Sequence, residues 1–268
     1  MKPEPHAEAP VATLHHLANS GGTLLTRAVA VLADALVLSE VHPDRELAWL
    51  YHPFRQMAVG YGALLDDTDR AALDRHFLDE MGVCRCVAAR HGRRLVVRDH
   101  AQTDFFTHGR RASRLRGLLA ERFPVVPVAT VRHPLDVYLA MRDNGLHDGA
   151  PDAVFDALAA FLDAFADCPV MRYESFVDDP VAALAHLAGL LGLDPAGAPP
   201  DRAALEAAMA RVDWMTGAGG RRSATVAGRP RREVARFEVL ACAKSPVYAD
   251  LCARLGYAPD PAASPLAQ

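Results

Sequence analysis

The longest uninterrupted apolar run rich in β-branched residues, 125–131, is the feature that most constrains the fold of this chain. A strand of that composition is typical of the centre of a parallel sheet, where side chains on both faces are buried. Four further segments resemble short buried strands and are separated by helical patterns: 11–17, 35–38, 94–98 and 170–173. Strands that alternate with helices predict a mostly parallel sheet with helices on both faces. The expected fold class is α/β, a single three-layer domain over residues 11–258.

Composition limits the classes of function. The 268 residues are sufficient for a full core, and the formal net charge of −4 argues against a general nucleic-acid or membrane surface. No run approaches membrane-spanning length, and residues 1–10 lack the basic and apolar regions of a signal peptide. We expect a cytoplasmic protein, bacterial by its high Ala and Arg usage, with mobile termini at 1–10 and 259–268.

The cysteines do not indicate a disulfide framework or a metal site. There are five, an odd and scattered set that fits reduced thiols. Cys84 and Cys86, with His76 and His91 nearby, suggest a metal-binding spacing. On a helix, however, positions i and i+2 point to different faces, so we expect no metal there.

The turn after the first predicted strand carries residue types suited to an anion. Residues 19–25 read Asn-Ser-Gly-Gly-Thr-Leu-Leu and lead from an apolar run into a helical pattern. Because Gly21 and Gly22 have no β-carbon, the backbone can take positive φ and a bound group can approach the amides. These amides stand at a helix N-terminus, where the dipole favours negative charge, and Ser20 and Thr23 add hydroxyl donors. The alternative is an ordinary capped turn between strand and helix.

Polar residues follow the other predicted strands as well. Ser39-Glu40, Asp99-His100 and Arg132-His133-Pro134 each stand where a strand ends. In open parallel sheets, ligands bind beyond the carboxyl ends of the strands. We therefore expect these residues and the 19–25 turn to line one pocket.

The order of these pieces resembles the sulfotransferases that use 3′-phosphoadenosine-5′-phosphosulfate (PAPS). The 19–25 turn is similar to their 5′-phosphosulfate loop, and residues 130–137, a strand followed by Arg-x-Pro-x-Asp, are similar to their 3′-phosphate motif. Residues 171–180 resemble their Tyr-Glu segment before a late helix, and the Arg-rich stretch 217–232 resembles their late basic loop. The resemblance implies a P-loop NTPase-like sulfotransferase architecture. The turn has no Gly-Lys-Ser/Thr, which counts against a kinase.

The resemblance also implies a reaction and a set of ligands. The reaction is in-line transfer of a sulfuryl group from PAPS to a hydroxyl or amine of a small-molecule or glycan acceptor, with a general base and no metal. The implied nucleotide-binding residues are Asn19, Ser20, Gly21, Gly22, Thr23, Leu24, Arg132, Arg221, Arg222, Arg231 and Arg232. Asn19 departs from the family's usual Lys or Arg, and Ala140 stands where many members have a Ser on the 3′-phosphate. The late arginines are expected to compensate, since guanidinium groups suit phosphate oxygens.

Two residues are candidates for the general base. Glu40 follows the second predicted strand, where tyrosine- and glycan-type sulfotransferases place a catalytic glutamate; otherwise it is a surface carboxylate or a partner of Arg27. His100 follows the third, where small-molecule sulfotransferases place a histidine, and imidazole titrates in a range suited to this work. Otherwise it is a loop histidine that bonds to the backbone. We favour Glu40.

Other functions and residues stay open at this point. A P-loop-type kinase and a catalytically silent nucleotide-binding relative are the alternative functions. His15 and His16 alternate across a strand, so one is expected to face the pocket and the other a helix. Trp214 and Met215 line an acceptor pocket or pack in the core. A basic segment offers either an anionic-substrate surface or a solvated face through Arg110, Arg111, Arg114 and Arg116.

Overall fold

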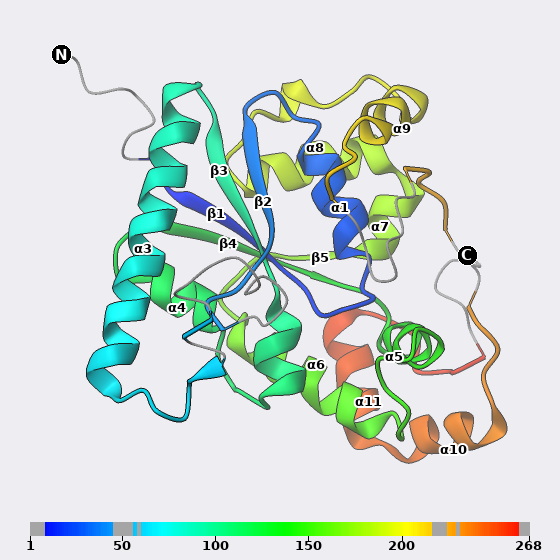
Figure 1. The fold of residues 1–268 in the computed structure, drawn as a ribbon. Helices are drawn as coiled ribbons and strands as arrows, with labels where there is room; N and C mark the ends of the chain where they lie inside the picture. Colours follow the sequence, from blue (N-terminus) through cyan, green and yellow to red (C-terminus); the bar gives the residue numbers. More distant parts are fainter. Residues whose placement is uncertain (1–8, 45–55, 58–59, 216–223, 229–230, 263–268) are drawn as a thin grey trace.

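A computed structural model describes residues 9–44, 56–57, 60–215, 224–228 and 231–262, and the statements below concern these residues. Its sheet has five strands, all paired in parallel, in the order β2-β3-β1-β4-β5 (Figure 1). The strands are β1 (Val11–His15), β2 (Ala35–Val41), β3 (Arg94–Asp99), β4 (Val125–Val131) and β5 (Val170–Arg172). The predicted α/β class with a parallel sheet flanked by helices is confirmed.

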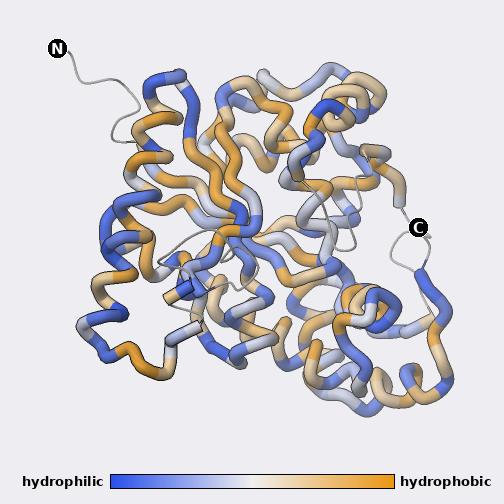
Figure 2. The backbone as a smooth tube through the Cα atoms, viewed as in Figure 1, coloured by the Kyte–Doolittle hydropathy of each residue, from blue (hydrophilic) through white to orange (hydrophobic). Residues whose placement is uncertain are grey.

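Side chains of the central strand β1 alternate between the two faces of the sheet, as the pleat of a strand requires. Ala12 and Leu14 pack on one face with Leu25 and Val29 of helix α1. Val11 packs on the opposite face. Hydrophobic residues follow the strands in Figure 2, as expected for a sheet covered on both sides.

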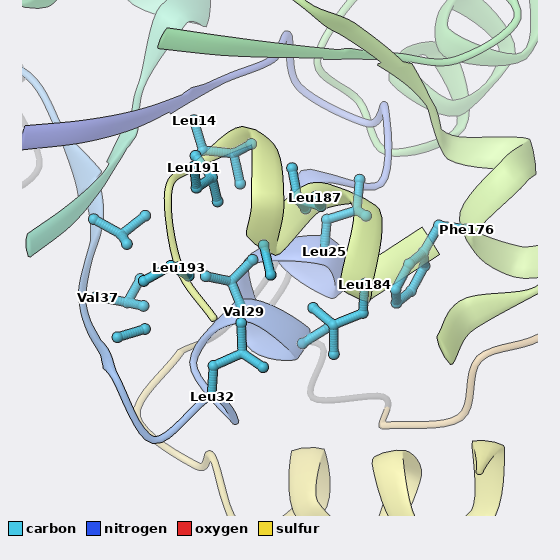
Figure 3. Close-up of a cluster of buried hydrophobic side chains, with 14 of the residues drawn as sticks. Leu14, Leu25, Val29, Leu32, Val37, Phe176, Leu184, Leu187, Leu191 and Leu193 are labelled. Carbon is cyan, nitrogen blue, oxygen red and sulfur yellow. The ribbon is translucent and has the colours of Figure 1, made fainter. Parts of the chain in front are cut away.

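One face of the sheet is covered by helices around α1. They are α1 (Gly22–Val29), α7 (Tyr173–Asp178), α8 (Pro180–Leu190) and α9 (Arg202–Ala210). In Figure 3 the leucines of α8 and the loop after it lie against Leu25 and Val29 of α1. This packing holds the first turn of α1 at the carboxyl end of β1.

The other face carries two helical groups. The first contains α3 (Asp67–Arg90), which begins at a capping box formed by Asp66 and Asp69, and α4 (Arg114–Ala120). The second contains α5 (Pro134–Asp143), α6 (Asp152–Ala164) and the C-terminal α11 (Pro246–Leu255) (Figure 1). No helix in the described ranges has both the length and the apolar composition needed to cross a membrane.

Several elements of the structure were not expected from the sequence. The C-terminal residues form two helices, α10 (Arg236–Lys244) and α11, because Pro246 has no N–H to continue α10 and Ser245 caps the new helix. A π-helical turn (Thr103–Thr107), a short 3₁₀ turn (Pro195–Gly197) and α7 were not predicted. Strand β2 extends to Val41, with a register shift between Leu38 and Val41.

The helices that follow the neighbouring strands β1 and β4 lie on opposite faces of the sheet. His15 of β1 is in register with Ala129 of β4. Helix α1 follows β1 and packs on one face, whereas α5 follows β4 and packs on the other. In open α/β sheets, ligands bind beyond the carboxyl ends of the strands where the chain diverges in this way.

Candidate functional site

The bend between β1 and α1 has the backbone conformation that its small residues permit. Asn19 and Gly21 both have left-handed backbone, with φ of 65° and 87°. The Ser20 hydroxyl donates to the carbonyl of Leu17 at 2.6 Å, and the Leu24 amide donates to the carbonyl of Gly21 at 3.0 Å. The amides of the first helical turn that lie before Leu24 have no acceptor within the helix, so this end of α1 offers donors to an anion.

Two aromatic rings lie against the glycines of the bend. A β-carbon at Gly21 would lie 2.2 Å from the ring of Tyr173, and one at Gly22 would lie 1.8 Å from Nε2 of His16. Both separations are below contact distance, and Gly21 also has positive φ. The two glycines are therefore required by the packing of the bend itself, besides any approach of a ligand.

Arg132, at the end of β4, reaches this bend. Its Nη1 donates to the backbone carbonyl of Asn19 at 3.4 Å, and its guanidinium lies 5.1 Å from the ring centre of Tyr173. Asn144, just after α5, donates from Nδ2 to Oδ1 of Asn19 at 2.5 Å. The structure thus brings together the turn and the arginine that the sequence motifs assign to one nucleotide.

Three buried polar atoms around the bend have no hydrogen-bond partner within the described residues. They are Nδ2 of Asn19, Nε of Arg132 and Nδ1 of His16. Buried polar groups are nearly always hydrogen-bonded, and those that are not call for an explanation such as a missing ligand. A group rich in acceptor oxygens at this position would satisfy them.

Glu40 is joined to the bend through Arg98. Arg98 is buried at the end of β3 and places Nη2 3.0 Å from Oε1 of Glu40 and Nε 2.9 Å from Nε2 of His16. Its Nη1 donates to the Ser39 hydroxyl at 3.1 Å. Glu40 has positive φ, 59°, which is strained for a residue with a β-carbon. Strain of this kind is concentrated at functional sites, and the side chain is partly exposed.

His100, the second candidate base, follows β3 directly. Its Nδ1 lies 2.7 Å from the hydroxyl of Thr103 in the π-helical turn, and its ring is half-buried. Burial is the largest cause that lowers the pKa of His16, and the charge of His100 is one of the smaller ones. Both candidate bases therefore lie near the bend, on the strand ends where the sequence placed them.

The late arginines divide into two groups. Arg221 and Arg222 lie outside the described residues. Arg231 is buried and its Nε donates to Asp136 of α5 at 2.8 Å, and Arg232 lies 3.2 Å from Asp143 of the same helix. Ala140 is buried within α5. Arg231 and Arg232 thus attach the end of the Arg-rich stretch to the helix that begins beside Arg132.

The Tyr-Glu segment after β5 makes buried hydrogen bonds that the sequence did not reveal. One oxygen of buried Glu174 accepts from the His133 amide at 3.0 Å, and the other accepts from the Tyr257 hydroxyl at 2.6 Å. Glu174 therefore holds the segment next to Arg132 in place. Only the adjacent Tyr-Glu pair in the sequence hints at this, because Tyr257 is far away along the chain.

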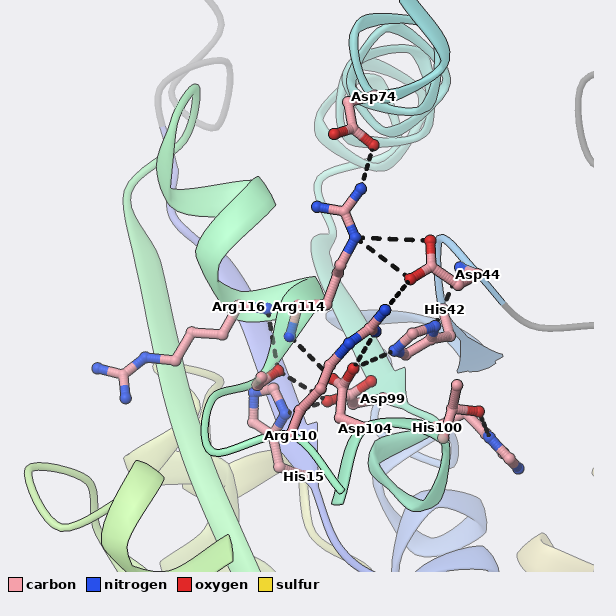
Figure 4. A network of polar contacts seen from close by, with 12 residues as sticks. His15, His42, Asp44, Asp74, Asp99, His100, Asp104, Arg110, Arg114 and Arg116 are labelled. Atoms are coloured by element: carbon pink, nitrogen blue, oxygen red, sulfur yellow. Dashed lines mark hydrogen bonds and ion pairs between the residues drawn. The ribbon is translucent and has the colours of Figure 1, made fainter. Parts of the chain in front are cut away.

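In the basic segment, Arg110 and Arg114 are engaged in ion pairs instead of forming a free anionic-substrate surface, whereas Arg111 is exposed to solvent. Arg110 pairs with Asp104 at 2.7 Å and with Asp44 at 2.9 Å, while Arg114 pairs with Asp44 and Asp74 (Figure 4). Asp104 also lies 3.1 Å from Nε2 of His42, and neither side chain is exposed. Burial alone would raise the pKa of Asp104, but hydrogen bonds and charge from its partners, His42 first, lower it overall.

Of the remaining candidates, His15 and Met215 are buried in the protein, whereas Trp214 is on its surface. His15 lies between Asp99, at 2.7 Å, and Thr13, at 2.8 Å, with its ring 4.4 Å from that of Phe165. Trp214 is exposed, and Met215 is buried in the core. The described residues include no cluster of three or more His, Cys, Asp or Glu arranged to hold a metal ion.

Comparison with known proteins finds relatives only among solved structures: no protein-family model and no curated protein matches the sequence. The chain resembles the sulfotransferase domain of the Synechococcus PCC 7002 olefin synthase, with 17% identity over 72% of this chain and 77% of that chain and a TM-score of 0.43. It also resembles a sulfotransferase from Alicyclobacillus acidocaldarius, with 14% identity, coverage of 76% and 90%, and a TM-score of 0.41. For mouse sulfotransferase SULT7A1 complexed with PAP, identity is 14%, coverage 71% and 64%, and the TM-score 0.37. These three neighbours are sulfotransferases, as the sequence motifs predicted, and at these identities the likeness is one of fold.

Proposed function

We propose that this chain is a sulfotransferase that moves a sulfuryl group from PAPS to a hydroxyl or amine of a small-molecule or glycan acceptor. The observation that carries the proposal is the meeting of Asn19 and Arg132 at the start of α1, each with a buried nitrogen that has no partner in the described chain. The bend supplies backbone amides and Arg132 a planar guanidinium, and both suit phosphate oxygens.

The residues of the bend are not equally free to bind. The hydroxyl proton of Ser20 and the amide of Leu24 are already donated within the turn. The amides of Gly22 and Thr23, in the first turn of α1, have no acceptor within the helix. We assign the phosphosulfate to these amides, with Asn19, and the 3′-phosphate to Arg132.

The reaction forms a bond between the acceptor oxygen or nitrogen and sulfur and breaks the bond between sulfur and the 5′-phosphate oxygen. The electron pair of the broken bond leaves with the phosphate, whose charge the bend stabilises. The acceptor proton passes to a carboxylate, for which we favour Glu40. Arg98 orients Glu40 and holds it beside the bend.

Calorimetric titration with 3′,5′-adenosine bisphosphate tests the proposal. We expect wild type to bind and Arg132→Ala to lose about ten- to a hundredfold in affinity, as for a charge-assisted hydrogen bond. Arg90→Ala is the matched control, because Arg90 ends α3 at the opposite end of the strands. A wild type that does not bind, or an Arg132→Ala variant that binds equally well, would overturn the proposal.

The uncharged side chain of Asn19 favours a second candidate function, which is binding of the nucleotide without sulfuryl transfer. An amide can donate a hydrogen bond but brings no positive charge to the leaving phosphate. Tight binding of 3′,5′-adenosine bisphosphate with no transfer from PAPS to any of a panel of phenols, alcohols, amines and sugars would favour this function. A requirement for ATP and magnesium would instead indicate a kinase.

A further inference from the structure

His16 occupies the space that a side chain at position 22 would take. Its ring atoms lie 1.8 to 2.1 Å from the place where a β-carbon on Gly22 would stand. Gly22 is the first residue of α1, and His16 is buried, with only 4% of its surface exposed. The imidazole is therefore packed directly against the helix turn whose amides face the proposed anion.

The hydrogen bond from Arg98 fixes the tautomer of His16. A guanidinium group has donors and no acceptor, so at 2.9 Å its Nε donates and Nε2 of His16 accepts. The hydrogen of the neutral ring is then on Nδ1. Burial, followed by the charge of Arg98, also holds the pKa of His16 well below its usual value, so the ring stays neutral.

The Nδ1–H of His16 is a buried donor without an acceptor in the described residues. The His16 ring packs against Gly22, three residues after Asn19, whose Nδ2 is also buried without a partner in the described residues. Buried donors are rarely left in this state in a folded protein, because the hydrogen bond to water is lost without replacement. Two such donors beside the free amides of one helix turn point to an acceptor-rich ligand.

We infer that His16 donates a hydrogen bond from Nδ1 to an oxygen of the phosphate or sulfate group held at the bend, as a neutral ligand-binding residue. This inference rests on the proposed function for the identity of the anion. With Asn19, it supplies two neutral donors at the place where the resemblance to sulfotransferases implies a charged side chain. Because Arg98 contacts both His16 and Glu40, its guanidinium orients the imidazole that donates to the anion as well as the candidate base.

Two substitutions separate a ligand-binding role from a merely structural one. His16→Gln places an amide near the Nε2 position, where its oxygen still accepts from Arg98, but removes the donor at Nδ1. His16→Asn does the reverse, because its shorter amide reaches only the Nδ1 position. If His16 has only a structural role, His16→Gln should lower the affinity for the anion less than His16→Asn does. If His16 binds the ligand, His16→Asn should lower that affinity less than His16→Gln does.

The experiment is calorimetric titration of the whole chain with 3′,5′-adenosine bisphosphate and, separately, with inorganic pyrophosphate. We expect His16→Gln to bind both about tenfold more weakly than wild type and His16→Asn to bind more tightly than His16→Gln. His186→Gln, at an exposed position on α8, is the control and is expected to bind like wild type. Equal binding by His16→Gln and wild type would overturn the inference.

A spectroscopic measurement on the wild type covers the case in which a variant fails to fold. In protein with ¹⁵N-labelled histidine, the Nδ1-bound proton of His16 is expected to shift when pyrophosphate is added, and an unchanged signal would overturn the inference. His16-dependent binding of pyrophosphate without binding of the nucleotide would sustain the inference and reject the proposed function. Binding of neither anion by wild type would reject both.

Discussion

Arg132 donates from Nη1 to the backbone carbonyl of Asn19 at 3.4 Å, which joins the end of β4 to the bend after β1. The two residues are 113 positions apart in the chain. They meet because β1 and β4 are neighbours in the sheet and both strands end at the same edge. A ligand held by the bend is therefore within reach of the Arg132 side chain, and the sheet fixes that geometry.

The first prediction concerns the general base. We expect Glu40→Gln to lower turnover about 10²- to 10⁴-fold. The amide keeps the shape of the side chain but cannot take up the proton that leaves the acceptor substrate. Affinity for 3′,5′-adenosine bisphosphate should stay at the wild-type level. Turnover is measured as release of that nucleotide from PAPS in the presence of the acceptor panel.

His100→Gln is the matched comparison for Glu40→Gln. If Glu40 is the base, His100→Gln should leave most of the turnover intact. Loss of turnover in His100→Gln, together with an active Glu40→Gln, would assign the base to His100. Loss of nucleotide affinity in either variant would place that residue in binding.

The second prediction concerns the two glycines of the bend. Gly21→Ala should cost at least about 2 kcal/mol of unfolding free energy, since it combines positive φ with a clash against Tyr173. Gly22→Ala should cost about 1–3 kcal/mol from its clash with His16, and it should cost less in a His16→Ala background, where the ring is absent. Gly117→Ala in α4, where a β-carbon meets nothing within 4 Å, is the control.

Urea denaturation measures these free energies. Gly117→Ala should be neutral or stabilising by about 0.5–1 kcal/mol, the usual gain of Ala over Gly within a helix. If Gly22→Ala cost as much in the His16→Ala background as in wild type, the packing of His16 against the helix turn would be refuted.

Much of this architecture could be predicted from the sequence because its signals are local. All five strands are short apolar segments bounded by polar or small residues, and the Asn-Ser-Gly-Gly turn lies where the pattern placed it. Helix α7 was missed because its six residues are too few to show a helical period. Pro246 is the only local signal of the break between α10 and α11, because apolar residues continue on both sides of it.

The contacts of the site could not be predicted, because they join residues far apart in the chain. Arg98 is read from sequence as the last residue of a strand, and nothing local shows that it bridges His16 and Glu40. Likewise, Arg231 is expected to face a phosphate, and nothing local shows that its Nε also donates to Asp136 of the Arg-x-Pro-x-Asp motif. Such pairings depend on the order of strands, which the sequence pattern leaves open.

The third prediction concerns the bridge from Glu174 to Tyr257. Tyr257→Phe removes the donor that lies 2.6 Å from the buried carboxylate and should cost about 1–3 kcal/mol of unfolding free energy. In a double-mutant cycle with Glu174→Gln, the two changes should be coupled by about 1 kcal/mol or more. Tyr61→Phe, at an exposed site, is the control and should be neutral. Additive effects in the cycle would show that the two side chains do not stabilise each other.

The fourth prediction concerns the pH dependence of stability. Burial, together with the charge of Arg231, lowers the pKa of His133 from 6.5 to about 4. Between these two values the unfolded chain binds a proton that the folded protein does not, so stability falls as the pH falls from 6.5 to 4. The contribution of His133 over that window is about 3 kcal/mol. The lowered pKa of His16 acts in the same direction.

Urea denaturation at a series of pH values between 4 and 7 measures this slope. His133→Gln should reduce the slope without abolishing it, because His16 still contributes. His186→Gln, which removes an exposed imidazole, should leave the slope unchanged. A His133→Gln variant with the full wild-type slope would show that His133 takes up its proton equally in the folded and unfolded chain, and that its burial beside Arg231 does not govern its titration.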